Sequence, residues 1–537
     1  MIRNIFSKPL DTITHAALFI GAASFLSRLI GLLRDRLLAH LFGAGPTLDA
    51  YYSAFLIPDF IYTLLIVGAL SASFIPSFIS QRDENTDNGW KFFNATLIVC
   101  GITIFVGISG LMLCTPTLIP LLAPGLTPEA QTLSILMTRI MLFSPLIMGI
   151  SSVVSGALQS QKLFFVTSLS PILYNLGIII GALFLVPTYG PIALAYGVII
   201  GAALHLLIQL PSLIYIGYKP IVRGYDVREF SHMCTASIPR IFSLGSSQIQ
   251  TIIMVGFAST LTAGGVSMFT FANNIQSFPI GLIGISFAIA AFPTLSTAAQ
   301  SRKEEVFMTH ILQTLRTILI CIVPLAIIFL LLRMQIVRVL LGSGAFDWTD
   351  TIITGNTLGF FALSLFAQCL IPLLTRGFFA KKDTKTPSLI AMFGVLIAIG
   401  LGYILKPYMG IPGLALSISI SSIVQVSLLF LFLTHRQHDL KTLPLLRFLS
   451  VVTGGSIVMA FMIQSLKAPV SLLVNMDTGF GILTQGAITA TIGLLCYVGI
   501  LYLFRVDEIR IIKAQIQRKF FTKKPVIMEL VDSENSL

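Results

Sequence analysis

Long apolar runs recur along the whole chain and limit the folds that it can adopt. Many of them reach the roughly 20 residues that a helix needs to cross a membrane, whereas a membrane β-strand needs only about 10. The chain is 55% hydrophobic and 10% charged, against roughly 25% charged residues in soluble domains. These features predict an all-α polytopic membrane protein.

The apolar runs divide into about fourteen expected membrane helices. Several exceed the length that one crossing needs, so tilt or extension beyond the bilayer is expected. The expected spans lie near 13–42, 50–80, 92–123, 130–160, 165–186, 191–217, 229–261, 266–299, 305–341, 350–380, 386–405, 411–434, 445–466 and 480–504. We interpret the first as a retained helix, because no convincing small-residue cleavage site follows it.

Lysine and arginine gather in alternate loops, which predicts the orientation of the chain. Positive residues mark the cytoplasmic side, so both termini are expected there, and Arg333 and Arg338 are the main exceptions. The net charge of +12 is therefore a topology signal. It does not indicate nucleic-acid binding, because the sequence contains no basic patch interleaved with aromatic residues. The basic loops contain Arg82, Lys91, Lys162, Lys219, Arg223, Arg228, Arg302, Lys303, Lys381, Lys382, Lys385, Arg436 and Lys441.

An internal repeat is visible at an offset of about 220 residues. It places Pro187, Gly190, Leu194 and Ala195 opposite Pro407, Gly410, Leu414 and Ala415. Six helices fit in each copy, so the two copies point the same way, and a substrate site is expected between them. The predicted domains are a six-helix lobe at 1–222, a second six-helix lobe at 223–440, two further helices at 441–505 and a basic tail at 506–537.

Four charged residues interrupt the first apolar run: Arg28, Arg34, Asp35 and Arg36. Each charge at mid-membrane costs about 2.5–3.5 kcal/mol, and such residues usually face a cavity or a partner. Arg28 and Asp35 are two helical turns apart on one stripe, about 10 Å along the axis. Arg34 and Arg36 flank Asp35 on opposite sides, so both cannot enter one narrow cavity. The alternative is that 34–36 form an interfacial cap.

Two further arginines lie within expected helices. Arg240 follows Pro239, and the repeat places it opposite Arg28, so the two would approach one central cavity from the two lobes. Arg139 is a weaker candidate. The alternative for each is an arginine that extends to the membrane interface. Asp59, beside Pro58, is a candidate partner for these arginines. Clustered arginines in a cavity suit a phosphate or pyrophosphate, because the planar guanidinium binds such oxygens bidentately.

The scattered cysteines and histidines indicate no metal site. The six cysteines occur singly, without a CxxC pair, and are typical of small apolar packing residues. Neither a metal nor a cofactor is predicted.

The stretch SRLIGLLRDRLLAHLFGAGPTLDAYYSAFLIP, followed by GALSASFIPSF, resembles the opening of the MurJ (MviN) family of lipid II flippases. FFAKKDTKTP at 378–387 supports the resemblance. It implies a transporter of the multidrug/oligosaccharidyl-lipid/polysaccharide exporter superfamily in the bacterial cytoplasmic (inner) membrane. Such a protein moves undecaprenyl-pyrophosphate-linked peptidoglycan precursor from the inner to the outer leaflet, and has the precursor and membrane lipids as its partners.

The resemblance also implies roles for individual residues. Arg28, Arg34 and Asp35 match the cavity residues of the family's first helix, and Asp49 matches its TDA aspartate. Asp383 matches a residue in a region linked with cation binding, although it is equally a loop charge. The driving force is left open among Na⁺, H⁺ and the membrane potential.

The chain also departs from the family pattern at several charged positions. Tyr62 and Thr63 stand where two arginines are common, and Val67 replaces a glutamate. In the eighth expected helix, ADRLMEFP is replaced by ANNIQSFP, which puts Asn273, Asn274 and Ser277 in place of Asp, Arg and Glu. These changes leave the fold implied by the resemblance intact. They weaken what the resemblance implies about the transported substrate and the coupling ion.

Three other functions are weighed against the flippase. A flippase for other lipid-linked oligosaccharides, or a drug/cation antiporter of the same superfamily, would share the fold. A small cation would favour an acidic cavity, whereas this one is expected to be rich in arginine. A membrane glycosyltransferase would need a base and metal ligands in a sizeable polar loop, and no such loop is visible. The chain is therefore predicted not to be an enzyme.

Overall fold

The computed structural model describes residues 13–64, 74–221, 245–301, 303–435, 442–506 and 508 of the 537-residue chain. Within these residues every regular element is a helix, and no β-strand occurs. The all-α prediction is confirmed for this part of the chain.

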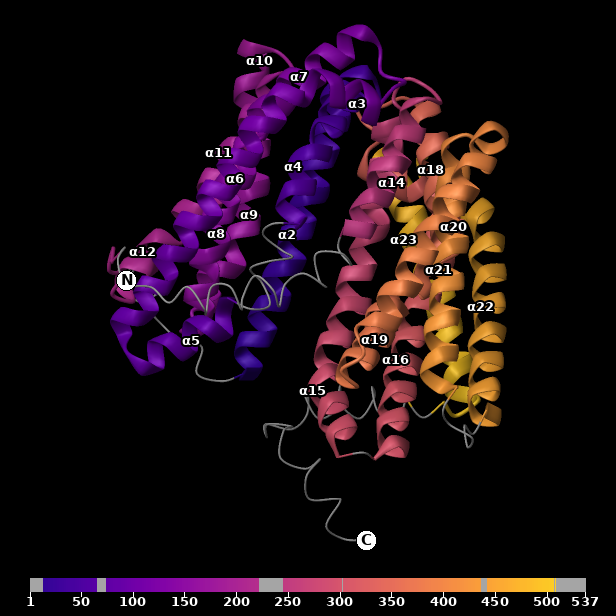
Figure 1. The fold of residues 1–537 in the computed structure, drawn as a ribbon. Helices are drawn as coiled ribbons and strands as arrows, with labels where there is room; N and C mark the ends of the chain where they lie inside the picture. Colours follow the sequence, from indigo (N-terminus) through magenta and orange to yellow (C-terminus); the bar gives the residue numbers. More distant parts are fainter. Residues whose placement is uncertain are drawn as a thin grey trace.

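Helices of the first half of the chain gather on one side of the molecule (Figure 1). They begin with α2, whose 30 residues make a helix about 45 Å long. The bounds are α2 (Ile13–Phe42), α3 (Pro46–Ala54), α4 (Leu56–Ile61), α5 (Phe74–Glu84), α6 (Thr86–Leu122), α7 (Pro128–Met141), α8 (Phe143–Ser160), α9 (Phe164–Ile180), η2 (Gly181–Leu185), α10 (Val186–Tyr189), α11 (Ala193–Leu207) and α12 (Leu210–Tyr215).

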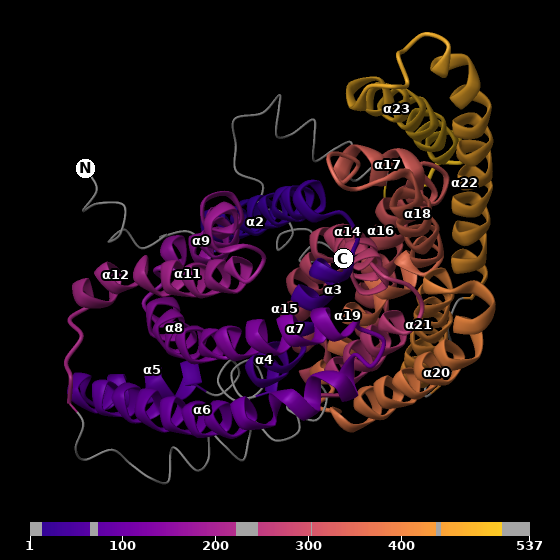
Figure 2. The same cartoon turned by 90° about the horizontal axis from the view of Figure 1, so that it is seen from above.

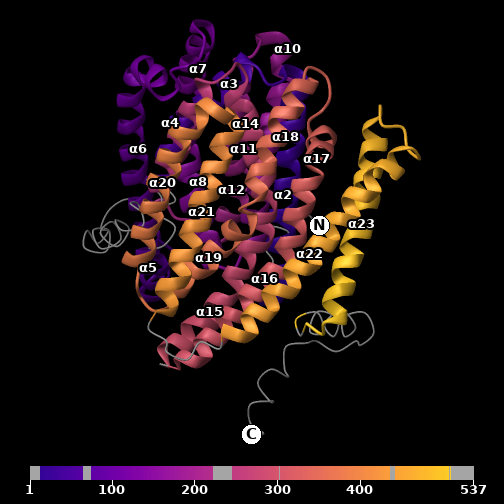
Figure 3. The same cartoon turned by 90° about the vertical axis from the view of Figure 1, so that its right-hand side faces the viewer.

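Helices of the second half lie opposite, and the last two lie at the periphery. Residues 245–259 are helical and precede α14. The bounds are α14 (Gly265–Pro279), η3 (Ile280–Ile285), α15 (Ser286–Gln300), α16 (Glu304–Leu331), α17 (Arg333–Leu340), α18 (Trp348–Ala362), α19 (Leu365–Ala380), α20 (Lys385–Met409), α21 (Ile411–Thr434), α22 (Thr442–Ser471) and α23 (Gly479–Leu503). α22 and α23 pack on each other, and contact α16 and α17 from outside (Figures 2 and 3).

Ten helices of the described residues are long and apolar enough to cross a membrane, or eleven if the bent pair α18 and α19 forms one span. The chain is thus a multi-pass membrane protein. Three of the fourteen predicted spans are not in this count. The first carries the charges of α2, and the second and seventh include undescribed residues at 65–73 and 222–244. The number fourteen therefore stays a prediction.

Backbone geometry recurs at the offset that the sequence repeat predicts. Lys162 and Lys382, 220 positions apart, are both non-glycine residues with a φ of 61°. Gly190 and Gly410, also 220 positions apart, have φ values of 69° and 61° and end the helices before them. A left-handed backbone is rare for a lysine, so this coincidence is independent support for an internal repeat.

The two halves meet tightly at one end of the molecule, which we call the closed end and define by the turns 43–45, 260–264 and 342–347. The Ala345 N–H donates to the carbonyl of His40 over 3.0 Å, and the Ala44 N–H donates to Asp350 Oδ2 over 3.0 Å. Gly264 has a φ of +82°, and a Cβ there would overlap the carbonyl of Ala44. Glycine therefore allows backbones of the two halves to touch.

Candidate functional site

The charges of α2 lie where this helix runs between the two halves of the chain. α2 packs on α9 of the first half and contacts α14 of the second. Asp35 is buried, with 2% of its surface exposed, and its Oδ1 accepts from the Nε and Nη2 of Arg34 over 3.0 and 2.8 Å. A buried carboxylate needs such a partner, because desolvating an unpaired charge is costly.

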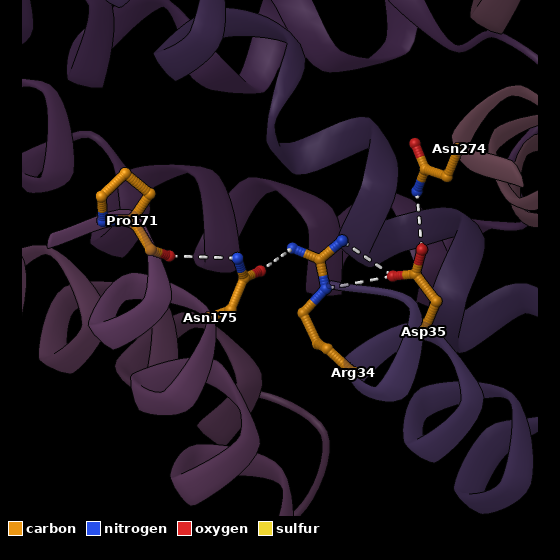
Figure 4. Close-up of polar contacts among 5 residues, drawn as sticks. All are labelled: Arg34, Asp35, Pro171, Asn175 and Asn274. Atoms are coloured by element: carbon orange, nitrogen blue, oxygen red, sulfur yellow. Dashed lines mark hydrogen bonds and ion pairs between the residues drawn. The ribbon is translucent and has the colours of Figure 1, made fainter. Parts of the chain in front are cut away.

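Two asparagines extend this ion pair in both directions (Figure 4). Arg34 Nη1 donates to Asn175 Oδ1 of α9 over 3.1 Å, and the Asn175 amide donates to the carbonyl of Pro171. On the other side, Asn274 Nδ2 of α14 donates to Asp35 Oδ2 over 2.9 Å. A continuous polar chain thus joins α9, α2 and α14, and any ligand that displaces one member changes the contact between the halves.

Arg28 lies two turns before Asp35 and reaches the second half directly. Its Nη1 donates to the carbonyl of Ser277 over 3.1 Å, and the rings of Phe25 and Phe278 meet beside it, 5.5 Å apart. Arg28 also lines a pocket of about 520 Å³ with Ser24, Ser27, Gln159, Thr167 and Ser168 among the lining residues. Among the described residues no carboxylate pairs with Arg28, so its guanidinium can bind an anion.

A carboxylate and several tyrosines surround the ion pair. Asp59 interacts electrostatically with Arg34 and with Tyr174 of α9, and part of its surface is not covered by other protein atoms. The hydroxyls of Tyr51 and Tyr52 are buried, and neither has a hydrogen-bond partner in the described part of the chain. They are polar groups beside the charged cluster that a ligand can use.

Residues at which the sequence departs from the family pattern belong to this same cluster. Asn274 holds Asp35, and Ser277 accepts from Arg28 through its carbonyl. Tyr62 lies near Asp59 and hydrogen-bonds Ser152. Val67 lies outside the described residues. The described charges of the cluster are consequently balanced, with Arg28 and Arg34 against Asp35 and Asp59, so the described cavity is not dominated by arginine.

The remaining predicted site residues do not join this cluster through the described contacts. Asp49 is buried at the closed end, where Oδ2 accepts from the Gly264 N–H over 2.7 Å and Oδ1 accepts from the N–H and hydroxyl of Ser267, each over 2.8 Å. It thus caps the start of α14, the helix that also carries Asn274. Arg139 donates to Thr115 over 3.1 Å. Arg240 lies outside the described residues.

Asp383 precedes α20 and binds the first turn of that helix. Its Oδ1 accepts from the N–H groups of Lys385 and Thr386, each over 3.0 Å, and its Oδ2 accepts from the Thr386 hydroxyl over 2.7 Å. Aspartate commonly accepts such hydrogen bonds as a capping residue at the start of a helix. The described residues include no group of three or more His, Cys, Asp or Glu side chains that could hold a metal. A cation role for Asp383 stays a prediction.

Sequence reasoning missed the partners that complete the cluster, namely Asn175, Tyr174, Tyr51 and Tyr52. Asn175 had a detectable signal, because an amide inside the apolar run 165–186 is costly without a partner. The tyrosines had none, since their rings fit an apolar helix surface.

Gly281 sets the position of Arg28 and supplies a test. A Cβ at Gly281 would overlap the Arg28 guanidinium, and that flexible side-chain end moves more easily than a backbone. We therefore expect Gly281→Ala to leave the protein level near normal while greatly reducing transport in a growth assay. Gly21→Ala is the control, because a Cβ at Gly21 meets open space. Equal activity of both variants would show that the observed Arg28 position is not needed.

Comparisons with known proteins identify relatives over most of the chain. The profile of the family described as lipid II flippase MurJ matches residues 38–481. The lipid II flippase MurJ of Burkholderia cenocepacia is 30% identical over 461 residues, 83% of this chain and 88% of that protein. A probable lipid II flippase MurJ of Rhizobium tropici is 27% identical over 93% of this chain and 96% of that protein.

Solved structures agree with these sequence relatives. A structure of the lipid II flippase MurJ in an inward closed conformation has a TM-score of 0.77 at 27% identity, covering 91% of this chain and all of that chain. A multidrug resistance MATE transporter in an inward-facing conformation has a TM-score of 0.65 at 18% identity, with 76% of this chain and 94% of that chain covered; it shows the shared fold alone. The family match over most of the chain, together with these relatives, shows that this chain belongs to the MurJ family of lipid II flippases.

Proposed function

We propose that this protein is a lipid II flippase, which moves the undecaprenyl-pyrophosphate-linked peptidoglycan precursor from the inner to the outer leaflet of the bacterial inner membrane. Family membership over most of the chain is the observation that carries the proposal. A flippase transports its substrate unchanged, so we expect no catalysed reaction and no cofactor.

Arg28 is the best placed described group for the pyrophosphate. It lines a polar pocket and has no carboxylate partner among the described residues, and its planar guanidinium suits two phosphate oxygens. Arg34 would join it by exchanging its contact with Asn175 for a substrate oxygen. The prenyl tail would stay in lipid, and we propose that α22 and α23 form a groove for it.

Transport then requires two arrangements of the halves. We propose that fourteen helices form two six-helix lobes plus α22 and α23, and that the lobes rock about the α2 cluster. The recurring backbone geometry and the tight closed end support this view. In the described arrangement access would be from the end opposite the closed end. Breaking the contacts of Arg28 with Ser277 and of Asp35 with Asn274 would free α2 from α14 and admit the headgroup.

Coupling remains open among Na⁺, H⁺ and the membrane potential. Asp59 is the carboxylate to examine first for a coupling cation, because it is exposed within the helix array and interacts with Arg34. Asp383 is the second candidate. The exposed Asp59 is also the one observation that favours a drug/cation antiporter, but the family membership makes that function the weaker proposal.

The orientation with both termini in the cytoplasm gives a topology prediction. Single cysteines in place of Tyr189, at the end of α10, and of Ala263, in the turn 260–264, should react with an impermeant thiol reagent in intact cells, because both positions are exposed and belong to connections without lysine or arginine. Cysteines in place of the exposed Lys162 and Lys303 should react only after the membrane is opened. The reverse pattern would refute the orientation.

Growth of cells depleted of their own lipid II flippase tests the function itself. Expression of this chain should restore growth and cell shape. Failure to do so, with the protein present in the membrane, would favour another exported substrate.

A further inference from the structure

A basic pocket lies far along the chain from the α2 cluster, at the junction of α16 and α17. It has a volume of about 450 Å³ and is lined by Arg333 and Asn356 and by the apolar residues Leu330, Phe360, Leu363, Met409 and Pro412, with Gly359. Arg333 is one of the two main exceptions to the loop charge pattern, and the transport function above makes no use of it.

Two cations meet at this junction. Arg333 Nη1 donates to the carbonyl of Leu330 over 2.8 Å, and Lys467 of α22 donates to the carbonyl of Leu331. The two side chains are close enough for their charges to repel each other. No carboxylate of the described residues forms an ion pair with either of them.

The end of α16 explains only part of this positive charge. A helix carries about half a negative charge at its carboxyl end, whereas the two side chains bring two full positive charges. The remaining charge of roughly +1.5 lies in a half-buried place, where an anion would be favourable. The helix end accounts for the position of each cation but not for the repulsion between the two, which a bound anion would relieve.

The geometry of Arg333 leaves room for that anion. Its aliphatic part lies against Gly359, where a Cβ would approach the Arg333 Cδ to 2.7 Å. Its Nε faces Asn356 Oδ1 over 3.4 Å. These described contacts use Nε and Nη1 of Arg333 and Oδ1 of Asn356. Arg333 Nη2 and Asn356 Nδ2 are therefore available to donate to a ligand.

The turn between α20 and α21 places the pocket near a membrane surface. Met409 and Pro412, two of its lining residues, flank Gly410, where α20 ends and α21 begins. Both helices are long and apolar enough to cross a membrane, so the turn that joins them lies at the level of the lipid headgroups. The apolar wall formed by Phe360, Leu363 and Met409 suits the first carbons of an acyl chain.

We infer that this pocket, at Arg333 and Asn356 with Lys467 beside it, binds the phosphate group of an anionic membrane lipid. The orientation proposed above assigns that lipid to the outer leaflet, but the binding itself does not depend on the orientation or on the transported substrate. Because Lys467 belongs to α22, the bound lipid would also hold the α22–α23 pair against α16.

Lipid retention by the purified full-length protein tests the inference. Native mass spectrometry should show that the wild-type chain retains phosphatidylglycerol in preference to phosphatidylcholine. Arg333→Gln should reduce the retained phosphatidylglycerol about tenfold, as expected for loss of a charge-assisted contact, and Lys467→Gln should reduce it less. Asn356→Ala keeps both cations and should also lower phosphatidylglycerol retention. This second variant tests the pocket if Arg333→Gln does not fold.

Lys406→Gln is the matched control. This lysine stacks on Phe257 and Tyr403, so its loss removes one charge at the same end of the protein without touching the pocket. Phosphatidylglycerol retained equally by wild type and the pocket variants, or lost equally in Lys406→Gln, would overturn the inference. Displacement of the lipid by inorganic phosphate at equal concentration would also overturn it, because the ligand would then be free phosphate.

Discussion

Alanine in place of Arg34 is expected to abolish flipping while the protein level stays near normal, and Arg28→Ala should do the same. Each guanidinium would lose a charge-assisted phosphate contact, worth about 1.5–3 kcal/mol. For Arg34 the loss is larger, because Asp35 has 2% of its surface exposed and would remain as a buried charge that, among the described residues, only Asn274 holds. The measurement is survival of flippase-depleted cells, with the protein level checked by immunoblot.

Lysine at either position keeps the charge but lacks the planar fork, so it should rescue only in part. Arg36→Ala is the matched control on the same helix. Arg36 is exposed and donates to the carbonyl of Val339 on α17, away from the cluster, and its loss should be tolerated. Normal growth of Arg28→Ala and Arg34→Ala, with death of Arg36→Ala, would mean that the wrong face of α2 has been assigned to the substrate.

Asp35→Asn separates two roles of the carboxylate. If Asp35 only positions Arg34, the variant should be less damaging than Arg34→Ala, because an amide oxygen still accepts from the guanidinium. If Asp35 carries a coupling proton or cation, the two variants should be equally damaging in the same growth assay.

Alanine in place of Asp49 is expected to open the closed end. The carboxylate accepts three hydrogen bonds from Gly264 and Ser267, and each charge-assisted bond contributes about 1.5–3 kcal/mol. Their combined loss, about 4.5–9 kcal/mol, includes the roughly 5.5 kcal/mol that moves a two-state equilibrium from 1:99 to 99:1. Spin labels at the exposed Leu41 and Ala263 should show one short distance in the unaltered chain and a second, longer distance in Asp49→Ala.

Asp49→Asn is the graded control for this experiment. Its amide oxygen still accepts from one or two of the three donors, so the longer distance should be less populated than in the alanine variant. If the distances in Asp49→Ala matched those of the unaltered chain, Asp49 would not hold the closed end together. Its predicted contact with substrate would then be the role to test.

Patterns within one helix were predictable, whereas contacts between helices were not. The α2 charges follow from local spacing, and so does the opposition of Arg34 and Arg36, because a helix fixes which side chains share a face. The partners of these charges, Asn175 and Asn274, are 141 and 239 positions away in the chain. No local pattern specifies such pairings, and the offset of 220 relates equivalent residues of the two halves, not residues in contact.

The role of Asp49 shows the same limit. Asp49, in TLDA at 47–50, matches the aspartate of the family motif TDA, and the resemblance assigns it to the substrate. The structure instead places Asp49 at the start of α14, where it satisfies N–H groups that a helix leaves unpaired at its first turn. The sequence does not reveal that this carboxylate serves a helix 215 positions away, and a contact with substrate stays a prediction.

The most direct test of the proposed function measures lipid II on the outer face of the membrane. Cells in which this chain is the only flippase would be treated from outside with an impermeant enzyme that cleaves exposed lipid II. We predict rapid formation of the cleavage product with the unaltered chain, and loss of that product with Arg34→Ala at an equal protein level. Lipid II that stays protected with the unaltered chain, or that is cleaved equally with Arg34→Ala, would contradict transport through the α2 cluster.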